Sequence, residues 1–401
     1  MTLLPAKIDV LIVGGGPAGL SAATTLSRMG VSGVHLLERE PSAGGIPRLC
    51  AHSPYGMREW GRVMFGPSYA FRLVAEAEAA GAIIHCNTTV TALSKGGGVT
   101  VATPNGVQTI QAKAVLLATG ARETPRADRM VGGSKPGGVM NTGALQSLIA
   151  MHDQKPFRRP VIIGTELIAF SALLTCRLAG IAPVAIIEEA SRTTAWRMLD
   201  LMPRFLGCPV WYDTTLAAIH GRSQVESVTV LDKAGHRQID CDGVIFTGLF
   251  RPENALLRSS ALSIDPRTGG PLIDQYGRLS DPTYFAAGNI LRPVETAGWC
   301  WREGQQVAGS IVAALAGRLS DRARATPVIT EGSAIKYFLP QVLSETSGPA
   351  AFDCFQMRLS QPYTGKVIVN GRKLHLKSRP ERRILTRILP LPDSQNAPEI
   401  T

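Results

Sequence analysis

Apolar and polar residues are arranged in blocks at the start of the chain. Residues 8–13 are apolar apart from one aspartate, which predicts a buried strand. Residues 34–37 predict a second strand, and between the two a glycine-rich turn at 14–19 precedes an apolar run of helical length. The order strand, glycine turn, helix and strand predicts a βαβ unit with parallel strands.

The same order returns in the middle of the chain. Residues 161–163 predict a strand, 167–178 a helix that ends before Gly180, and 184–187 a strand followed by two glutamates. Because elements of the same kind recur in the same order, the chain duplicates an architecture and not a sequence. Short alternating runs follow each unit and predict a β-meander, at 90–95, 99–103 and 107–112 in the first half and at 210–212, 225–231 and 244–247 in the second.

The rest of the chain adds single elements and then changes in composition. From about residue 326, short strand-like runs are separated by prolines or by an Asn-Gly turn, which predicts a small β-rich C-terminal domain with a loose tail at 392–401. The runs of this domain are 335–339, 354–359, 366–369 and 373–376. The single elements are helices at 69–80 and 302–315 and strands at 82–86, 115–118 and 284–289.

The first glycine turn has the spacing that a dinucleotide pyrophosphate requires. Gly14 allows the tight turn, Gly16 lets the backbone approach the phosphates, and Gly19 lets the helix pack closely on the strand. The helix N-terminus presents free N–H groups and a partial positive charge to the anion. Glu38 ends the second strand, where it can accept hydrogen bonds from an adenosine ribose. We predict a nucleotide site here; the alternative is a glycine-rich turn without a ligand.

The corresponding turn of the second unit departs from this pattern. Residues 164–169 keep only the first glycine, and Glu166 stands at the position through which a phosphate would approach. A poorly solvated carboxylate there repels a pyrophosphate by roughly a few kcal/mol. We therefore expect weak or absent NAD(P)H binding.

Composition and charge narrow the functional classes. The 401 residues suffice for two or three domains, and 45% hydrophobic with 18% charged residues is typical of a globular protein. The net charge of +11 would suit nucleic acid, but aromatic residues make up only 6% and no nucleic-acid module is present. We expect no nucleic-acid partner and interpret the basic surface as suited to an acidic substrate or partner protein.

The seven cysteines include no Cys-x-x-Cys pair, which argues against a disulfide framework, a cysteine-ligated metal or cluster and a thioredoxin-type redox pair. We predict no metal site. The apolar stretch 160–187 is interrupted by Glu166, Arg177 and Pro183, so it predicts strand–helix–strand and not a membrane span. With no signal peptide at the start and no transmembrane segment, we expect a cytoplasmic protein.

Three glycine-bearing segments together carry a resemblance to a known superfamily. Residues 14–19 with Glu38, residues 117–121 and residues 285–289 resemble the two-dinucleotide-domain FAD/NAD(P)-binding flavoproteins, over about residues 6–318. This resemblance implies an α/β fold with two Rossmann-like, three-layer domains of the glutathione reductase and thioredoxin reductase kind. The implied division is 1–120 plus 244–325 for a discontinuous FAD domain, 121–243 for a degenerate NAD(P)-type domain and 326–401 for the small β-rich C-terminal domain.

Three further segments, 45–48, 55–59 and 298–304, resemble one branch of that superfamily. The branch includes the FAD-containing subunits of bacterial opine (octopine and nopaline) oxidases, one subunit of hydrogen cyanide synthase and the α subunits of heteromeric proline and D-hydroxyproline dehydrogenases. The resemblance implies that the partner is a catalytic β flavoprotein subunit. A small iron–sulfur subunit is a further partner that it allows, because longer members carry a cysteine-rich segment that this chain lacks.

The resemblance also implies FAD as the cofactor, with ATP in its place in some α subunits and FMN at a subunit interface as open alternatives. Relatives usually carry Asp, which holds the ribityl hydroxyls, where Asn289 stands; Asn can still accept such a bond. The glycine turns would meet at the carboxyl edge of the sheet. The expected cofactor-binding residues are Gly14, Gly16, Pro17, Ala18, Gly19, Glu38, Arg39, Gly45, Ile46, Pro47, Arg48, Val90, Thr119, Gly120, Gly288, Asn289 and Ala297.

No residue is identified as catalytic, and three are weak candidates. Cys300 could touch the flavin ring or be a buried structural thiol. Arg48 and His52 could bind flavin phosphates or a second flavin, or form ordinary surface salt bridges. The neighbouring Trp299 and Trp301 could form a docking patch or pack in the core.

Three functional hypotheses remain open on the sequence. The first is an FAD-binding α subunit of a heteromeric dehydrogenase or oxidase acting on an opine, imino acid or related secondary amine. The second is a stand-alone NAD(P)H-dependent FAD oxidoreductase, against which Glu166 and the missing cysteine pair count. The third is a non-catalytic, nucleotide-bound scaffold subunit.

Overall fold

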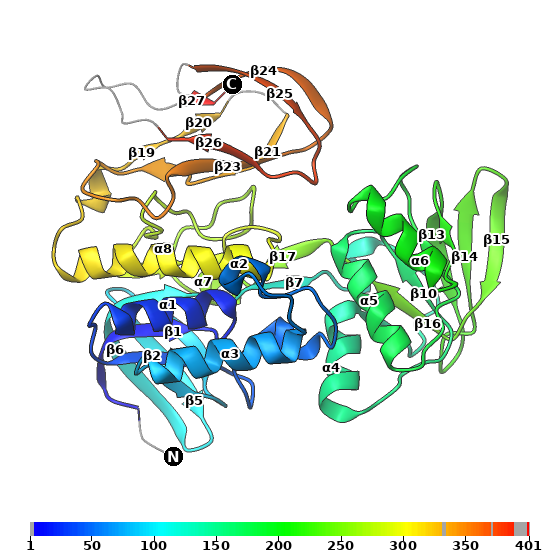
Figure 1. The fold of residues 1–401 in the computed structure, drawn as a ribbon, viewed down its shortest axis with the longest axis horizontal. Helices are drawn as coiled ribbons and strands as arrows, with labels where there is room; N and C mark the ends of the chain where they lie inside the picture. Colours follow the sequence, from blue (N-terminus) through cyan, green and yellow to red (C-terminus); the bar gives the residue numbers. More distant parts are fainter. Residues whose placement is uncertain (1–3, 331–333, 370–371, 389–398, 401) are drawn as a thin grey trace.

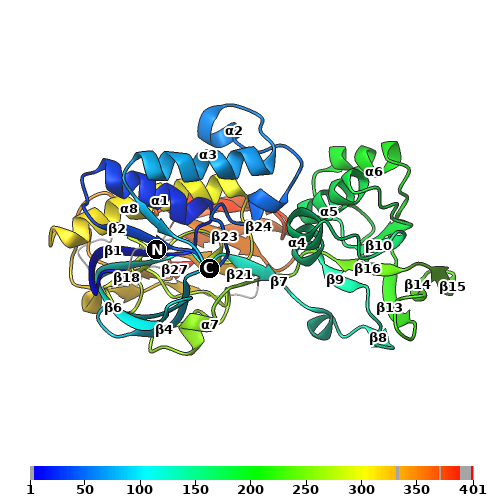
Figure 2. The same ribbon diagram turned by 90° about the horizontal axis from the view of Figure 1, so that it is seen from below.

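The strand β1 (Lys7–Val13) lies at the centre of the first sheet. It pairs in parallel with β2 (Val34–Leu37) and β6 (Gly106–Leu117), and β18 (Tyr284–Ala286) pairs with the other side of β6. The fold is seen in a computed structural model that describes residues 4–330, 334–369, 372–388 and 399–400. One face of the sheet is covered by the helices α1 (Pro17–Arg28), α3 (Gly66–Ala79) and α8 (Ala297–Leu315) (Figures 1 and 2).

The strand β6 corrects one expectation. The sequence predicted two strands, at 107–112 and 115–118, but Gly106–Leu117 is continuous because neither glycine nor proline interrupts it. Its first half pairs antiparallel with β5 (Gly98–Thr103), and its second half pairs parallel with β1. The strand thus joins the meander to the parallel sheet, whose order is β3 (Ile83–His85), β2, β1, β6, β5 and β4 (Thr89–Ser94).

The second unit contains a five-stranded parallel sheet in which β10 (Pro160–Ile163) is central. The helices α4 (Thr142–His152) and α5 (Leu167–Leu178) pack with it around the apolar side chains of Ile162 and Leu173. The sequence did not predict α4. The strand order is β12 (Val210–Trp211), β11 (Ala185–Ile187), β10, β16 (Gly243–Phe246) and β9 (Val139–Asn141).

The predicted second meander is partly wrong. The runs at 210–212 and 244–247 belong to the parallel sheet, since β12 pairs with β11 and β16 pairs with β10. The chain therefore leaves this sheet after residue 246, later than the boundary expected at 244, and the division into three domains stays a proposal. The antiparallel sheet has the order β15 (Gly235–Asp240), β14 (Ser227–Asp232), β13 (Thr215–His220) and β8 (Gly132–Gly133).

Two short strands carry the chain between the first and second units. The strands β7 (Ala121–Glu123) and β17 (Phe250–Pro252) pair antiparallel and lie between the two units in Figure 2. Short elements complete these units: η1 (Ile46–Leu49), α2 (Met57–Trp60), η2 (Arg126–Arg129), η3 (Arg197–Asp200), α6 (Leu201–Phe205), α7 (Ala255–Arg258), η4 (Gly288–Ile290) and η5 (Arg322–Arg324).

The C-terminal part is β-rich, as predicted, and its apolar core contains Phe338, Phe355 and Val367. Of the tail expected at 392–401, only the last strand lies within the described residues. One sheet has the order β21 (Ile335–Leu339), β23 (Cys354–Leu359) and β26 (Ile384–Arg387), and β19 (Thr326–Pro327) pairs with β22 (Val342–Leu343). The other has the order β20 (Ile329–Thr330), β27 (Glu399–Ile400), β24 (Tyr363–Val369) and β25 (Arg372–Ser378).

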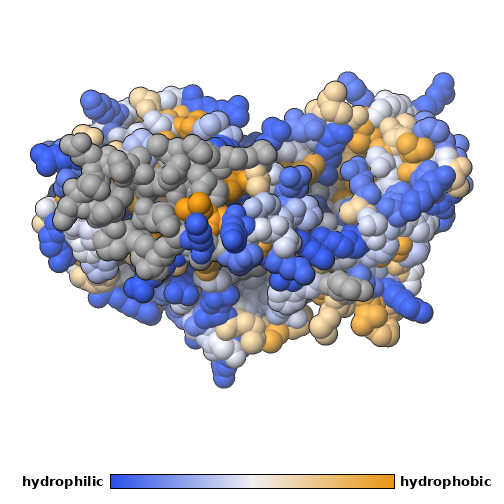
Figure 3. All heavy atoms as spheres, turned by 90° about the horizontal axis from the view of Figure 1, so that it is seen from above, coloured by the Kyte–Doolittle hydropathy of each residue, from blue (hydrophilic) through white to orange (hydrophobic). Residues whose placement is uncertain are grey.

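Two surface properties bear on function. Within the described ranges, no helix combines the length and the apolar composition that crossing a membrane requires. The face that carries the C-terminal sheets and the second unit is mostly hydrophilic, with apolar side chains gathered over the second unit (Figure 3). Trp196, Met198 and Phe205, on and beside η3 and α6, are among the exposed large apolar side chains.

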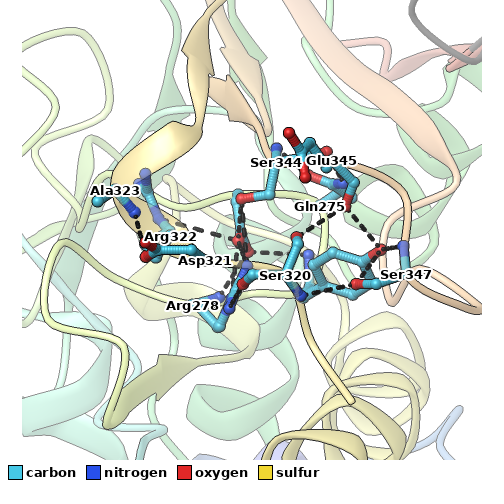
Figure 4. Close-up of polar contacts among 11 residues, drawn as sticks. Gln275, Arg278, Ser320, Asp321, Arg322, Ala323, Ser344, Glu345 and Ser347 are labelled. Atoms are coloured by element: carbon cyan, nitrogen blue, oxygen red, sulfur yellow. Dashed lines mark hydrogen bonds and ion pairs between the residues drawn. The ribbon is translucent and has the colours of Figure 1, made fainter. Parts of the chain in front are cut away.

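A buried polar network joins the C-terminal part to the first unit (Figure 4). The carboxylate of Asp274, fully buried, accepts hydrogen bonds from Arg278 Nε at 2.9 Å and from the Ser344 hydroxyl at 2.8 Å. Gln275 exchanges two hydrogen bonds with the backbone of Ser344, at 2.6 and 2.8 Å. The same carboxylate lies 3.8 Å from Arg322 Nε. One buried acid thus balances two guanidinium groups.

Replacing that acid should destabilise the protein. Asp274→Asn keeps the shape but leaves Arg278 and Arg322 without a counter-charge, so we expect a loss of about 3–5 kcal/mol in the free energy of unfolding. Urea denaturation followed by tryptophan fluorescence measures it. The matched control is Asp213→Asn, which breaks an exposed ion pair with Lys233 at a residue with φ +49° that Asn tolerates, and should cost less than about 1 kcal/mol. Equal midpoints for the two variants would contradict the assignment.

Candidate functional site

Three turns meet at the carboxyl edge of the first sheet because three strands end there in register. Val13 of β1 and Ala286 of β18 both lie beside Leu117 of β6. The turns that follow these residues are 14–19, 118–120 and 287–289. A Cβ on Gly14, whose φ is +110°, would lie 2.5 Å from the Ala118 carbonyl oxygen, so glycine is required at this contact. The structure brings the three predicted turns together.

The helix α1 packs closely on this edge. A Cβ on Gly19 would collide with the Gly14 carbonyl oxygen, as the expected strand–helix contact requires. Gly288 has φ +80°, and a Cβ there would lie 2.8 Å from the Ala18 side chain. Pro17 is the first residue of the helix. The turn after β18 therefore contacts the first turn of α1.

The segment after β2 closes over the same turn. The Gly44 N–H donates to the Gly15 carbonyl at 2.7 Å. Gly45 has φ +63°, and a Cβ there would lie 2.8 Å from the Cα of Gly16. Of the residues that follow, Ile46 is exposed and Pro47 is buried. The predicted phosphate turn thus has a second wall of glycine backbone.

Glu38 is fixed at the edge by backbone donors. Its carboxylate accepts the Gly15 N–H at 2.9 Å and the Glu40 N–H at 3.0 Å, and it is 8% exposed. Each carboxylate oxygen has a second acceptor position, so the group can still accept ribose hydroxyls. Val90 begins its strand two residues after Thr88, whose N–H donates to the Glu38 carbonyl at 2.9 Å. Arg39, by contrast, is exposed and lies 3.6 Å from Glu40.

The arrangement fits a dinucleotide. The N-termini of α1 and α8 have no side-chain cap and no acidic residue in the first turn, so their N–H groups are free of competing carboxylates. A Cβ on Gly16 would find its nearest neighbour 4.0 Å away, and one on Gly120 would find nothing within 4 Å. Space therefore remains on the open side of two glycines of the cradle, where phosphates would approach. Ala297 is the first residue of α8, and the Thr119 hydroxyl donates to the Glu253 carbonyl at 3.0 Å.

Contacts around Gly288 include two that the sequence did not predict. The Asn289 side chain accepts the Glu295 N–H at 2.7 Å and donates to the Glu295 carbonyl at 3.1 Å, so it closes its own loop as well as facing the predicted site. Arg292 and Glu303 form an ion pair with exposures of 1% and 2%. The Gly288 N–H donates to Glu303 at 3.2 Å, and Arg292 donates to the Gly288 carbonyl at 3.2 Å. No sequence periodicity marks this pair.

The three weak catalytic candidates lie in different surroundings. Cys300 is 5% exposed, and burial raises the pKa of its thiol far above the ordinary value, so it remains protonated and unreactive. Arg48 donates to the Ser42 hydroxyl at 2.9 Å. His52 Nε2 lies 2.5 Å from the Ser171 hydroxyl of α5, and burial lowers the pKa of its imidazole. None of the described contacts joins Arg48 or His52 to Cys300.

Trp299, in the first turn of α8, is neither a bare patch nor simple core. The guanidinium carbons of Arg383 and Arg58 lie 3.6 and 3.9 Å from its ring centroid, and that of Arg302 lies at 5.7 Å. Cation–π contacts of this kind join α2, α8 and the C-terminal part. Trp301 is partly buried, packs against the core and accepts the Ser21 hydroxyl at its carbonyl at 2.6 Å.

The second unit repeats the turn but fills it. The carboxylate of Glu166 folds back so that a Cβ on Gly164 would lie 2.5 Å from its Oε2, and the Thr247 hydroxyl donates to it at 3.0 Å. Burial raises the pKa of Glu166. Gly248 also lies under this carboxylate. The space that is open beside Gly16 is thus occupied by an acidic side chain in the second copy.

A second buried carboxyl lies where the units join. Glu123, at the end of β7, accepts the Gly143 N–H at 2.9 Å and the Gly248 N–H at 3.2 Å. Burial raises its pKa to about 7. No group of acidic, histidine or cysteine side chains able to hold a metal ion is found in the part of the chain that the structure covers.

Comparisons with known sequences agree with this geometry. The profile of a family described as pyridine nucleotide-disulphide oxidoreductase matches residues 8–312. The "A" component of opine oxidase from Agrobacterium tumefaciens (strain Ach5) is 27% identical over 349 residues, which cover 78% of this chain and 64% of the relative. Thioredoxin reductase of Treponema pallidum (strain Nichols) is 31% identical over 290 residues, which cover 70% of this chain and 88% of the relative. The chain thus spans less than two thirds of the length of the opine oxidase relative.

Solved structures show the same fold. Thioredoxin reductase of T. acidophilum superposes with a TM-score of 0.65 and 23% identity, covering 77% of this chain and 99% of that one. L-proline dehydrogenase from P. horikoshii superposes with a TM-score of 0.60 and 22% identity, covering 77% of this chain and 56% of that one. At this identity the likeness establishes the α/β architecture predicted from the sequence.

The open side of Gly16 provides a test of the cradle. Gly16→Ala adds a methyl group that meets no protein atom closer than 4.0 Å at a residue with φ −85°, so the fold should be unchanged. Because that methyl group occupies the phosphate approach, we expect flavin affinity to fall by about tenfold or more. Flavin fluorescence on reconstitution measures the affinity, and thermal denaturation checks the fold. Gly309→Ala, in an open part of α8, is the control and should leave flavin binding unchanged.

Glu123 should make stability depend on pH. Its pKa of about 7 in the folded protein lies above the ordinary value of 4.5, so the folded state holds this proton more tightly than the unfolded state. The corresponding stabilisation is complete below about pH 4.5 and is lost as the pH rises through about 7, by at most about 3 kcal/mol. Compared with Glu123→Gln, the wild type should lose stability between pH 5 and pH 8 in urea titrations. Parallel curves for the two proteins would show that Glu123 does not titrate there.

Proposed function

The chain belongs to the pyridine nucleotide-disulphide oxidoreductase family and is a flavin oxidoreductase of that family; on this basis we propose that it is the FAD-binding α subunit of a heteromeric flavin-dependent dehydrogenase or oxidase. The observation that carries the proposal is the contrast between its two turns. The cradle at 14–19 is open beside Gly16, whereas the one at 164–169 is filled by Glu166. One dinucleotide therefore binds, and the usual NAD(P)H site does not receive a second.

The residues that would hold FAD are those of the first cradle. Backbone N–H groups at the N-terminus of α1 would bind the pyrophosphate, Glu38 would accept the ribose hydroxyls, and Asn289 with the start of α8 would hold the ribityl and ring portion. FAD supplies the ability to accept a hydride from a carbon beside an amine nitrogen. ATP in the same cradle is the alternative, and FMN at a subunit interface stays a prediction.

The proposed substrate class is an opine, an imino acid or a related secondary amine. It rests on the names of two relatives, the opine oxidase component described above and the α subunit of sarcosine oxidase from Corynebacterium sp. (strain P-1), which is 30% identical over 203 residues. Both names denote subunits, which supports two partners, a catalytic β flavoprotein and a small iron–sulfur subunit. A location in the cytoplasm remains a prediction.

A stand-alone NAD(P)H-dependent reductase is the second candidate. The 31% identity with thioredoxin reductase of T. pallidum favours it. However, that chemistry uses a pair of neighbouring cysteines, and this sequence has no Cys-x-x-Cys. The described thiols of Cys176 and Cys208 are buried, and burial raises their pKa values to about 12 and about 11. A scaffold without catalysis is the third candidate and differs from the first in that its flavin would not be reduced.

Anaerobic reduction of the bound flavin distinguishes these functions. We expect NADH and NADPH to leave the flavin of the isolated chain oxidised, and an opine or imino acid to reduce it when the β subunit is present. Glu166→Gly removes the carboxylate from the second turn and should strengthen NADH binding by about tenfold. The control, Glu189→Gln, removes an exposed carboxylate of the same unit.

Stopped-flow absorbance of the flavin and NADH fluorescence provide the measurements. Rapid bleaching of the wild type by NADH would establish the stand-alone reductase instead. A flavin that no amine reduces, even beside the β subunit, would favour the scaffold.

A further inference from the structure

The excess positive charge of the chain is concentrated in one short segment. Residues 354–388 contain nine basic residues and one acidic residue, so they carry a net charge of +8 out of +11 for the whole protein. A surface with so strong a charge excess attracts anionic partners and steers their approach. The structure shows how this charge is displayed.

The hairpin of β24 and β25 separates its apolar and cationic residues. Val367 and Leu376 face the C-terminal core. Lys373 and Lys377 alternate along β25 and therefore lie on one face, and Lys366 pairs with His375 on the same face. The three lysines are exposed, and none of the ion pairs among the described residues involves them. Diagonal neighbours of this kind lie roughly 7–8 Å apart and repel one another, so an anion would stabilise the face.

A groove continues this face at the base of the hairpin. It has a volume of about 490 Å³ and is lined by Pro362, Tyr363, Thr364, Lys377, Ser378, Arg379 and Arg382. Arg379 and Arg382 are exposed, and no described ion pair uses them. The groove therefore adds two free guanidinium groups to the three lysines.

The turn that ends the groove lies at the junction of all three parts of the molecule. Glu381 pairs with Arg192 of the second unit at 2.9 Å. Arg383 stacks on Trp299 at the N-terminus of α8 and lies 3.6 Å from Glu295. These two contacts hold the turn in place, so the unpaired cations beside it are displayed on an ordered support.

We propose that the outer face of this hairpin and the groove at its base, here called the basic groove, bind an acidic extended segment of a partner protein. Seven residues of β24 span about 23 Å, so an acidic strand of about ten residues covers the face and the groove. Carboxylates at alternate positions of such a strand match the alternate lysines of β25. The inference does not rest on the substrate proposed above.

Two other polyanions fit the basic groove less well. Single-stranded nucleic acid requires exposed aromatic rings on which bases stack. Tyr363, the aromatic residue of the groove, is only partly exposed, its ring packs over Gly365, and its hydroxyl donates to the Lys366 carbonyl at 2.9 Å. A lipid surface requires apolar side chains beside the cations, and none of the hairpin side chains that the structure describes is a large exposed apolar one.

The test uses a fluorescently labelled peptide of about ten residues in which glutamate and serine alternate. Fluorescence anisotropy with the full chain should show binding that weakens as salt is raised. The variant K373E/K377E/R379E should bind the peptide about tenfold or more weakly. The control K95E/R222E/R318E makes the same change in net charge at exposed positions elsewhere and should bind within about twofold of the wild type.

Each other outcome overturns the proposal. No peptide binding by the wild type, or an equal loss in both variants, would leave only a net-charge effect. Stronger binding of single-stranded DNA or phosphatidylglycerol vesicles, lost in the hairpin variant, would assign the groove to those ligands. Because β25 is the edge of its sheet among the described strands, aggregation of the hairpin variant with unchanged peptide binding would mean that the lysines only protect that edge. Circular dichroism checks folding, and K373Q/K377Q/R379Q replaces the variant if it unfolds.

Discussion

The close approach of three strand ends is the constraint on which the candidate site depends. Val13, Leu117 and Ala286 lie side by side, so the turns after them must share one small volume. Only backbone fits at the contact between Gly14 and the Ala118 carbonyl. The residues of the site are far apart in the sequence, but parallel pairing places their turns at one edge. What the site can bind is then decided by which side chains enter that volume.

The two copies of the βαβ unit show how one side chain decides this. The Gly14 N–H donates to the Leu37 carbonyl at 2.9 Å, and the Gly164 N–H donates to the Ile187 carbonyl at 2.8 Å. The backbones of the two turns are therefore held alike. Glu166 nevertheless brings a carboxylate to the place where phosphate charge would have to be accommodated. Loss of a nucleotide site in this fold thus requires a change of electrostatics and not of architecture.

The elements that sequence reasoning found are those with a local signal. Apolar periodicity and glycine spacing located β1, α1, β10 and α5 to within one or two residues. The pattern failed where tertiary pairing decides: residues 244–247 read as a meander strand but join the parallel sheet through β10. The ion pair of Arg292 with Glu303 and the stacking of Arg383 on Trp299 join distant residues, and neither has a periodicity that could have indicated it.

Those long-range contacts share α8, which makes this helix the link between the cradle and the C-terminal part. Glu303 of α8 accepts the Gly288 N–H, and Arg292 also donates to Gln356 of β23 at 3.0 Å. The path from the third turn of the cradle to the C-terminal sheet therefore runs through charges that are buried and paired. Removing one partner of such a pair leaves the other uncompensated, at a cost of about 3–5 kcal/mol. The C-terminal sheet is for this reason held in a fixed position relative to the cradle, and a protein bound on that sheet would meet the start of α8 in one orientation.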